Sequence, residues 1–148
     1  MIKSVLVPID LAQTDTGATA LTLARDVAEK YGSKLTLLHV VEKVPAFIQA
    51  QLPAGAHAKV LEDAKARLTA FAAEHGLSGN AEVLTREGSP ATEILGFASE
   101  ARSDMIVIAS HDPGVADYFL GSTAARVVRH AHCSVLVVRH PRDRKSVV

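Results

Sequence analysis

The amino-acid sequence predicts an α/β fold, a three-layer open sandwich built around a five-stranded, mostly parallel sheet. Two observations predict it. Short runs of β-branched and aliphatic residues alternate along the chain with segments in which small and aliphatic residues recur at helical spacing. The apolar runs are continuous and do not alternate with polar residues, which is typical of strands that helices cover on both faces.

The first half of the chain provides a strand over residues 4–9 and another over residues 35–41. The helix between them ends at Gly32, and its apolar face is formed by Ala18, Leu21, Ala24 and Ala28, with Leu23 and Val27 beside them. Residues 42–58 contain two prolines and a glycine, which predicts a long irregular loop. Such loops often carry function, and a loop with no role fits the sequence equally well.

The second half continues the alternation, with strands expected over residues 81–85, 105–109 and 134–138. The helices of this half are expected to point these residues inward: Val60, Ala64, Leu68 and Phe71; Ile94, Phe97 and Ala98; Ala124, Val127 and Val128. The resulting order is Rossmann-like, with the flavodoxin-like strand order 3-2-1-4-5. We expect one domain over residues 1–140 and a flexible basic tail over residues 141–148.

Composition excludes several classes of partner. Lys and Arg total 16, as do Asp and Glu, so the chain lacks the basic surplus that nucleic-acid binding requires. No apolar run reaches the roughly 18 residues of a membrane span, and the N-terminus lacks the layout of a signal peptide. The single cysteine, Cys133, forms no internal disulfide, which favours a cytoplasmic protein. Cys133 itself is expected to be a buried structural residue.

The most informative stretch joins the fourth strand to the last helix. The chain becomes polar at Ser110, and Gly121-Ser122-Thr123 then opens the helix. The first N–H groups of a helix have no intrahelical partner, the helix dipole favours negative charge there, and glycine lets an anion approach closely. The pattern predicts a phosphate site, with the alternative that Ser122 or Thr123 simply caps the helix.

Other candidate binding residues lie at the same edge of the sheet. Ligands of open parallel sheets bind at the carboxyl ends of the strands, where the strand order reverses. Asp10 follows the first strand and Val40 ends the second, while Ser110 and His111 follow the fourth. Asp10 has the alternative role of a helix cap or loop anchor. His39 lies in an apolar strand and is expected to be a core histidine with its hydrogen bonds satisfied.

Four stretches together resemble the universal stress protein family over nearly the whole chain. They are residues 5–10, 37–40, 88–90 and 120–139, of which the last is long and specific and the others are weak alone. The resemblance implies that ATP, ADP or AMP binds at the sheet edge, with Mg²⁺ or Mn²⁺ on the phosphates. The implied nucleotide-binding residues are Pro8, Ile9, Asp10, Val40, Ile108, Ala109, Ser110, His111, Gly121, Ser122 and Thr123.

The resemblance also implies roles for these residues. Asp10 would contact the base or ribose, the backbone of Val40 the adenine, and Ser122 and Thr123 the phosphates. His111 would touch phosphate or anchor its loop. Nucleotide-binding members of the family carry two glycines upstream of the Gly-Ser pair, where this chain has Ala109 and Asp112.

The leading interpretation is a stress-response binding module rather than an enzyme. Hydrolysis needs a group that positions water and a clamp on the metal, and the loop offers only His111, Asp112 and Asp117, without a P-loop lysine. The alternatives are a weak ATPase or autophosphorylating protein and a dimeric scaffold without nucleotide. We expect no catalytic residue and no metal site made of protein side chains.

A homodimer is expected through the last strand, Val135, Leu136, Val137 and Val138. A strongly apolar edge strand is an aggregation risk unless it is covered, and the resemblance implies that two copies pair near it. A phosphoacceptor receiver domain is set aside, because it needs paired acids after the first strand and a lysine after the fifth, where this chain has only Asp10 and Arg139. Flavin binding is supported by the fold alone.

Overall fold

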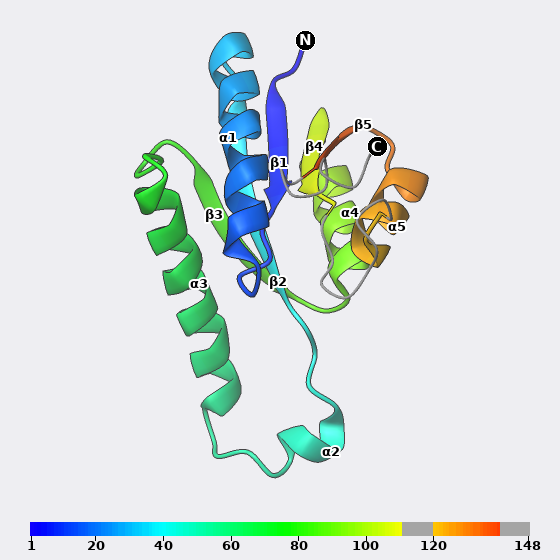
Figure 1. The fold of residues 1–148 in the computed structure, drawn as a ribbon. Coiled ribbons are helices and arrows are strands. Elements are labelled where there is room, and N and C mark those ends of the chain that lie inside the picture. The colour runs from blue at the N-terminus through cyan, green and yellow to red at the C-terminus, as the bar shows by residue number, and fades with distance from the viewer. Residues whose placement is uncertain (111–119, 140–148) are drawn as a thin grey trace, which may run out of the picture.

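The computed structural model describes residues 1–110 and 120–139 (Figure 1). Strands and helices alternate in the order β1 Ser4–Pro8, α1 Thr14–Tyr31, β2 Lys34–Val41, α2 Ala46–Gln49, α3 Ala56–Glu74, β3 Glu82–Glu87, α4 Pro90–Glu100, β4 Met105–Ala109, α5 Ser122–His130 and β5 Ser134–Val138. The five strands form one sheet in the order β3-β2-β1-β4-β5, and every neighbouring pair is parallel. The predicted fold class and strand order are confirmed, and the sheet is wholly rather than mostly parallel.

The sheet separates two apolar cores because successive side chains of a strand point to opposite faces. In β1, Val5 and Val7 pack with α1 and α3, whereas Leu6 packs with α4 and α5. Figure 1 shows α1 and α3 on one side of the sheet and α4 and α5 on the other. The continuous apolar runs in the sequence reflect this covering of both faces.

The helix ends follow their local sequences. Gly32 ends α1 in the left-handed conformation with φ of 65°, which glycine adopts without strain. Pro90 stands in the first turn of α4, as the sequence predicted, where its missing N–H has no acceptor to lose. At the start of α1, Gln13 occupies the capping position without a side-chain cap hydrogen bond.

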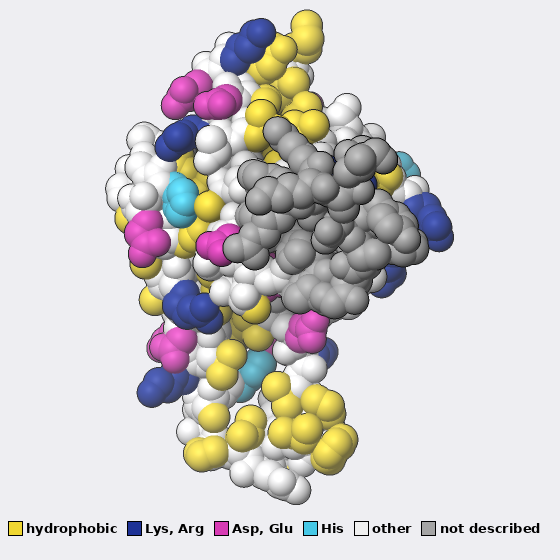
Figure 2. Space-filling model, viewed as in Figure 1, with side chains coloured by type: hydrophobic (Ala, Val, Ile, Leu, Met, Phe, Trp, Pro, Cys, Tyr) yellow, Lys and Arg dark blue, Asp and Glu magenta, His cyan; other side chains and the backbone are white. Residues whose placement is uncertain are grey.

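Residues 42–58 are more regular than predicted. They contain the short helix α2 and the first turn of α3, joined by a loop that extends well beyond the sheet (Figure 1). Phe47 is 72% exposed, and Ile48 and Leu52 are also exposed, so apolar side chains gather at this end of the molecule (Figure 2). Val60, predicted to point inward, is exposed because the beginning of α3 also extends past the sheet.

Val128 is a second residue predicted to be inward that is exposed. Helix α5 buries Ala124 and Val127 and packs against α4 and β5 at the margin of the sheet. This contact covers only a narrow stripe of α5. Val128, which follows Val127 and lies beside that stripe, is therefore exposed to solvent. Within the described part of the chain, no helix has the length and apolar character needed to cross a membrane.

Candidate functional site

A cleft of about 570 Å³ opens at the carboxyl ends of β1, β2 and β4. It lies where the strand order reverses between β1 and β4, the place at which open parallel sheets bind ligands. Most of the residues implied by the family resemblance line it, namely Pro8, Ile9, Asp10, Val40, Ile108, Ala109, Gly121, Ser122 and Thr123.

Among the implied residues that the structure describes, Ser110 does not line the cleft. Ser110 is buried; its N–H donates to the Val138 carbonyl at 3.1 Å, and its own carbonyl accepts from the Gly121 N–H at 3.1 Å. These bonds hold the end of β4 against β5 and against the start of α5, which is a structural role. His111 and Asp112 lie outside the described residues.

The start of α5 presents amide groups to the cleft. Gly121 is the capping residue and Ser122 the first helical one, and neither Ser122 nor Thr123 makes a side-chain cap, so the capping alternative is wrong. The Ala125 N–H donates back to the Gly121 carbonyl at 2.8 Å. The preceding N–H groups, of Ser122 to Ala124, have no intrahelical acceptor, and all three residues line the cleft. Together with the helix dipole they form an environment that suits an anion.

Asp10 anchors the turn that leads from β1 into α1. Its Oδ1 accepts from the Ala12 N–H at 2.9 Å, and its carbonyl accepts from the Gln13 N–H at 2.9 Å. This is an Asx-type turn, which the short aspartate side chain favours. Asp10 is exposed and lines the cleft, so its carboxylate anchors the loop with one oxygen while the residue faces the cleft.

His39 differs from its prediction as a core residue. Its Nδ1 lies 2.8 Å from the Ile9 carbonyl oxygen, but the side chain is only half-buried and lines the cleft. The reason is the strand register: the last residue of β1 pairs with Leu38, so β2 continues beyond its neighbour and His39 lies past that pairing.

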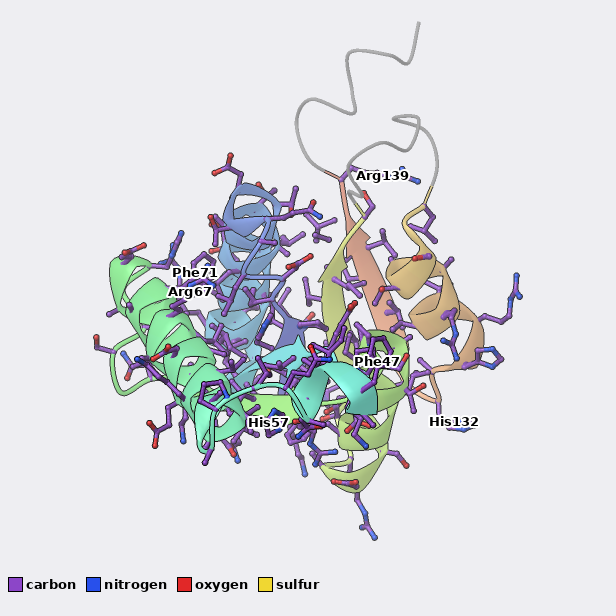
Figure 3. The ribbon with its side chains drawn as sticks, turned by 90° about the horizontal axis from the view of Figure 1, so that it is seen from below. Phe47, His57, Arg67, Phe71, His132 and Arg139 are labelled. Carbon is purple, nitrogen blue, oxygen red and sulfur yellow. The ribbon has the colours of Figure 1, made fainter. Side chains whose placement is uncertain are left out.

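Helix α3 supports this turn from outside the cleft. Arg67 points from α3 toward α1, and its Nη2 donates to the Leu11 carbonyl at 3.1 Å (Figure 3). Phe71 lies one turn further along α3 and packs against the first turn of α1. A Cβ added at Gly17, in that turn, would stand 3.6 Å from the Phe71 ring and 3.5 Å from the Ile9 side chain. Sequence reasoning missed Arg67, because no local pattern places a side chain of α3 beside a turn that is 56 residues away.

The charges around the cleft are few. Asp10 and Glu42 are the charged side chains among its described lining residues, and both are acidic. Within residues 1–110 and 120–139, no three His, Cys, Asp or Glu side chains gather as metal ligands. The donors that the described cleft offers to an anion are therefore backbone N–H groups and the Ser122 and Thr123 hydroxyls.

An all-parallel open sheet with a cleft at its reversal point and helices on both faces defines an α/β protein of the doubly wound class. The chain matches the model of the universal stress protein family over residues 1–139. A universal stress protein of Thermus aquaticus is 34% identical over 143 residues, which cover 94% of this chain and 100% of that protein. The chain therefore belongs to the universal stress protein family.

Solved structures show the same fold. The universal stress protein UspA from Lactobacillus plantarum superposes with a TM-score of 0.71 at 29% identity, over 93% of this chain and 98% of that one. A universal stress protein solved in complex with cAMP superposes with a TM-score of 0.69 at 22% identity, over 93% of this chain and 97% of that one.

Proposed function

We propose that this universal stress protein binds an adenine nucleotide, ATP, ADP or AMP, in the cleft and acts as a cytoplasmic binding module of the stress response. The observation that carries the proposal is the start of α5, where three backbone N–H groups without intrahelical acceptors border the cleft. A phosphate group would accept from these N–H groups and would be favoured by the helix dipole.

The remaining walls suit the rest of a nucleotide. Pro8, Val40, Ile94 and Ile108 provide apolar surface on which a base can lie, and Asp10 offers its carboxylate beside them. In this arrangement the phosphates lie at Ser122 and Thr123, and Mg²⁺ or Mn²⁺ would accompany them. Small-molecule sites commonly combine such an apolar lining with a few placed polar groups.

The distribution of charge favours binding over hydrolysis. Phosphoryl transfer needs cations that stabilise the charge on the transferred group. The described lining residues include no Lys or Arg that could supply this stabilisation. We therefore propose a protein whose ligand-bound state is its signal.

The β5 edge supports a further part of the proposal, a homodimer. Among the described residues β5 pairs only with β4, so its other edge is free for a second copy. Val135, Leu136 and Val137 are only half-buried within one chain, and an apolar edge strand of this kind is an aggregation risk unless it is covered. A second copy at this edge would bury them.

The nucleotide proposal is tested by calorimetric titration of protein that has been unfolded, stripped of ligand and refolded. We expect ATP with Mg²⁺ to bind, and a hundredfold excess over Kd to add about 2.7 kcal/mol to the free energy of unfolding. For a domain of this size the melting temperature would rise by roughly 5 °C. cAMP is titrated beside ATP, because the likeness to the cAMP complex concerns the fold and not the ligand.

A matched pair of glycine variants locates the phosphate position. Gly121→Val places a branched side chain at the start of α5 and is expected to abolish the thermal shift. Gly96→Val is the control, because Gly96 lies in α4 with open space around its Cβ position and does not line the cleft. If millimolar ATP and Mg²⁺ do not raise the melting temperature of the stripped wild type, the proposal is overturned. The remaining alternative is then a dimeric scaffold without nucleotide.

A further inference from the structure

Residues 43–55 form an arm that leaves the sheet at the rim of the cleft. Val41 and Glu42, directly before the arm, line the cleft, and the arm carries α2 beyond the carboxyl ends of the strands (Figure 1). Viewed onto the strand ends, α2 lies in front of them, between α3 and α4 (Figure 3). The two views place α2 outside the end of the sheet at which the cleft opens.

The side chains of the arm are apolar and uncovered. Helix α2 has no buried residue, and Phe47, Ile48 and Leu52 are all exposed. Residues 44–56 contain no Asp, Glu, Lys or Arg. Single exposed apolar side chains are normal, whereas a group of them in one uncharged segment marks a surface that binds something.

The arm is bonded to itself rather than to the body of the protein. The Ile48 and Gln49 N–H groups both donate to the Pro45 carbonyl at 3.0 Å, and the later turns of the arm are closed in the same way. Among the described residues, no hydrogen bond or ion pair joins residues 43–54 to the sheet or to α1, α4 or α5. The arm therefore moves as a unit without breaking such a bond or uncovering a buried side chain of α2.

Both ends of the arm are fixed at one place beside the cleft. Before the arm, the Val41 carbonyl accepts from the Gly88 N–H at 2.9 Å. After it, the His57 ring is paired with the Glu87 carboxylate, and Glu87 is the register partner of Val41. A segment held at two neighbouring points and free between them has the form of a lid.

The connections of the arm are short and suit a hinge. Residues 43–45 reach at most roughly 11 Å beyond Glu42, so α2 stays close to the cleft however these residues turn. At the other end, Gly55 precedes α3 with φ of 83°, a conformation that glycine adopts and leaves without strain. Closure needs backbone rotation only in these two short connections.

The cleft offers a place for an aromatic side chain from the arm. Val40, Pro90, Ile94 and Ile108 provide apolar lining, and the described lining residues include no Phe, Tyr or Trp. A planar ring that lies on this wall turns its other face away from it. Ligand sites normally bury most of the surface of their ligand, and aromatic side chains stack on ring faces. Phe47 is the aromatic residue of the arm.

We propose that the arm closes over the occupied cleft and that Phe47 is a binding residue, which covers the exposed face of the base. This inference rests on the proposed function, because the ring that Phe47 covers belongs to the bound nucleotide. Closure removes the Phe47 side chain and the base from water together, which is the physical reason for it to follow binding. Without a ligand the arm has no ring to cover and stays open.

Calorimetric titration of stripped protein with ATP and Mg²⁺ tests the role of Phe47. Phe47→Ala should weaken ATP binding roughly tenfold, the usual effect of losing an aromatic side chain stacked on a base. Its melting temperature without ligand should equal that of the wild type, because Phe47 is exposed there. Val60→Ala is the control: Val60 is also an exposed apolar residue, but it lies in α3 beyond the arm, and this variant should keep the wild-type affinity.

Fluorescence tests the closure itself. The chain contains no Trp, so Phe47→Trp provides a single reporter on the arm. Saturating ATP and Mg²⁺ should shift its emission to shorter wavelength and protect it from quenching by acrylamide, because the indole leaves water. Val60→Trp is the matched reporter outside the arm and should show neither change.

The outcomes separate this inference from the proposed function. If stripped wild type binds no nucleotide, the proposed function fails and the closure fails with it. If wild type and Phe47→Ala bind ATP equally, or if ATP leaves the Phe47→Trp reporter unprotected, nucleotide binding stands and the closure is overturned. If Phe47→Ala keeps its ATP affinity but sediments as a smaller species than wild type, the arm is a contact between copies of the chain and the assignment to the ligand is wrong.

Discussion

Among the individual residues, Cys133 has the environment of a structural thiol. It is half-buried between α5 and β5 and packs against the core beneath α4 and α5. Burial raises the pKa of this thiol above its ordinary 9.0, and the Asp104 carboxylate adds to the increase. Since the thiolate is the reactive form, we infer that Cys133 is unreactive in the native protein.

Replacing Cys133 tests this interpretation. Cys133→Ala should lower the free energy of unfolding by about 1 kcal/mol, the loss of one partly buried atom, and leave ATP affinity unchanged. The raised pKa stabilises the fold fully below pH 9.0, and this contribution is lost as the pH rises through the folded-state pKa. The wild type should therefore lose more stability than the variant at alkaline pH, as measured by urea unfolding. Labelling of the native thiol as fast as in the unfolded chain would contradict this.

Among the helices and strands, the segment from α2 to the first turn of α3 is joined to the sheet by a side-chain ion pair. α2 has no buried residue of its own, and the loop after it extends beyond the sheet. The His57 ring, in the first turn of α3, is paired with the carboxylate of Glu87 at the end of β3. Glu87 is the register partner of Val41, which lines the cleft, so this pair fastens the segment beside the cleft.

Hydrogen exchange measures this attachment. Glu87→Gln should increase the exchange rate of amides in residues 44–60 by about threefold to fivefold, because weakening one partly buried pair makes local opening easier. Glu82→Gln is the control on the same strand, since its partner Lys34 is largely exposed and lies far from α2. Equal exchange in the two variants would show that the His57 pair does not hold the segment.

At the scale of the whole molecule, the sheet has two edges with different surroundings. β3 forms one edge, packed with α3, and β5 forms the other. Val138 is buried against α1 within a single chain, so a charge there would damage the monomer itself. Val135 is half-buried and gives a cleaner probe of the proposed dimer.

Sedimentation of edge variants tests the dimer. Wild type should sediment as a dimer at micromolar concentration, and Val135→Lys should weaken association at least roughly tenfold, because it would bury a charge between the two copies. Val83→Lys makes the same change at a half-buried position of β3, on the opposite edge, and should remain dimeric. A wild type that is monomeric, or a Val135→Lys variant that stays dimeric, would exclude β5 as the interface.

Local sequence patterns are enough to predict the architecture of this protein. The strand-helix alternation follows from local periodicity, and Gly32 and Pro90 mark helix ends through their own backbone restrictions. Most implied site residues line one cleft, because the carboxyl ends of parallel strands necessarily meet at one edge. These features need no information about contacts between distant segments.

The polar groups that the cleft offers follow from contacts between distant segments of the chain. His39 lines the cleft because β2 extends beyond the end of β1. This extension depends on the register between the two strands. Arg67 reaches Leu11 only because α3 lies against α1, and Ser110 is withdrawn from the cleft by its bonds to Val138 and Gly121. Each depends on the relative placement of segments far apart in the chain, which local periodicity does not encode.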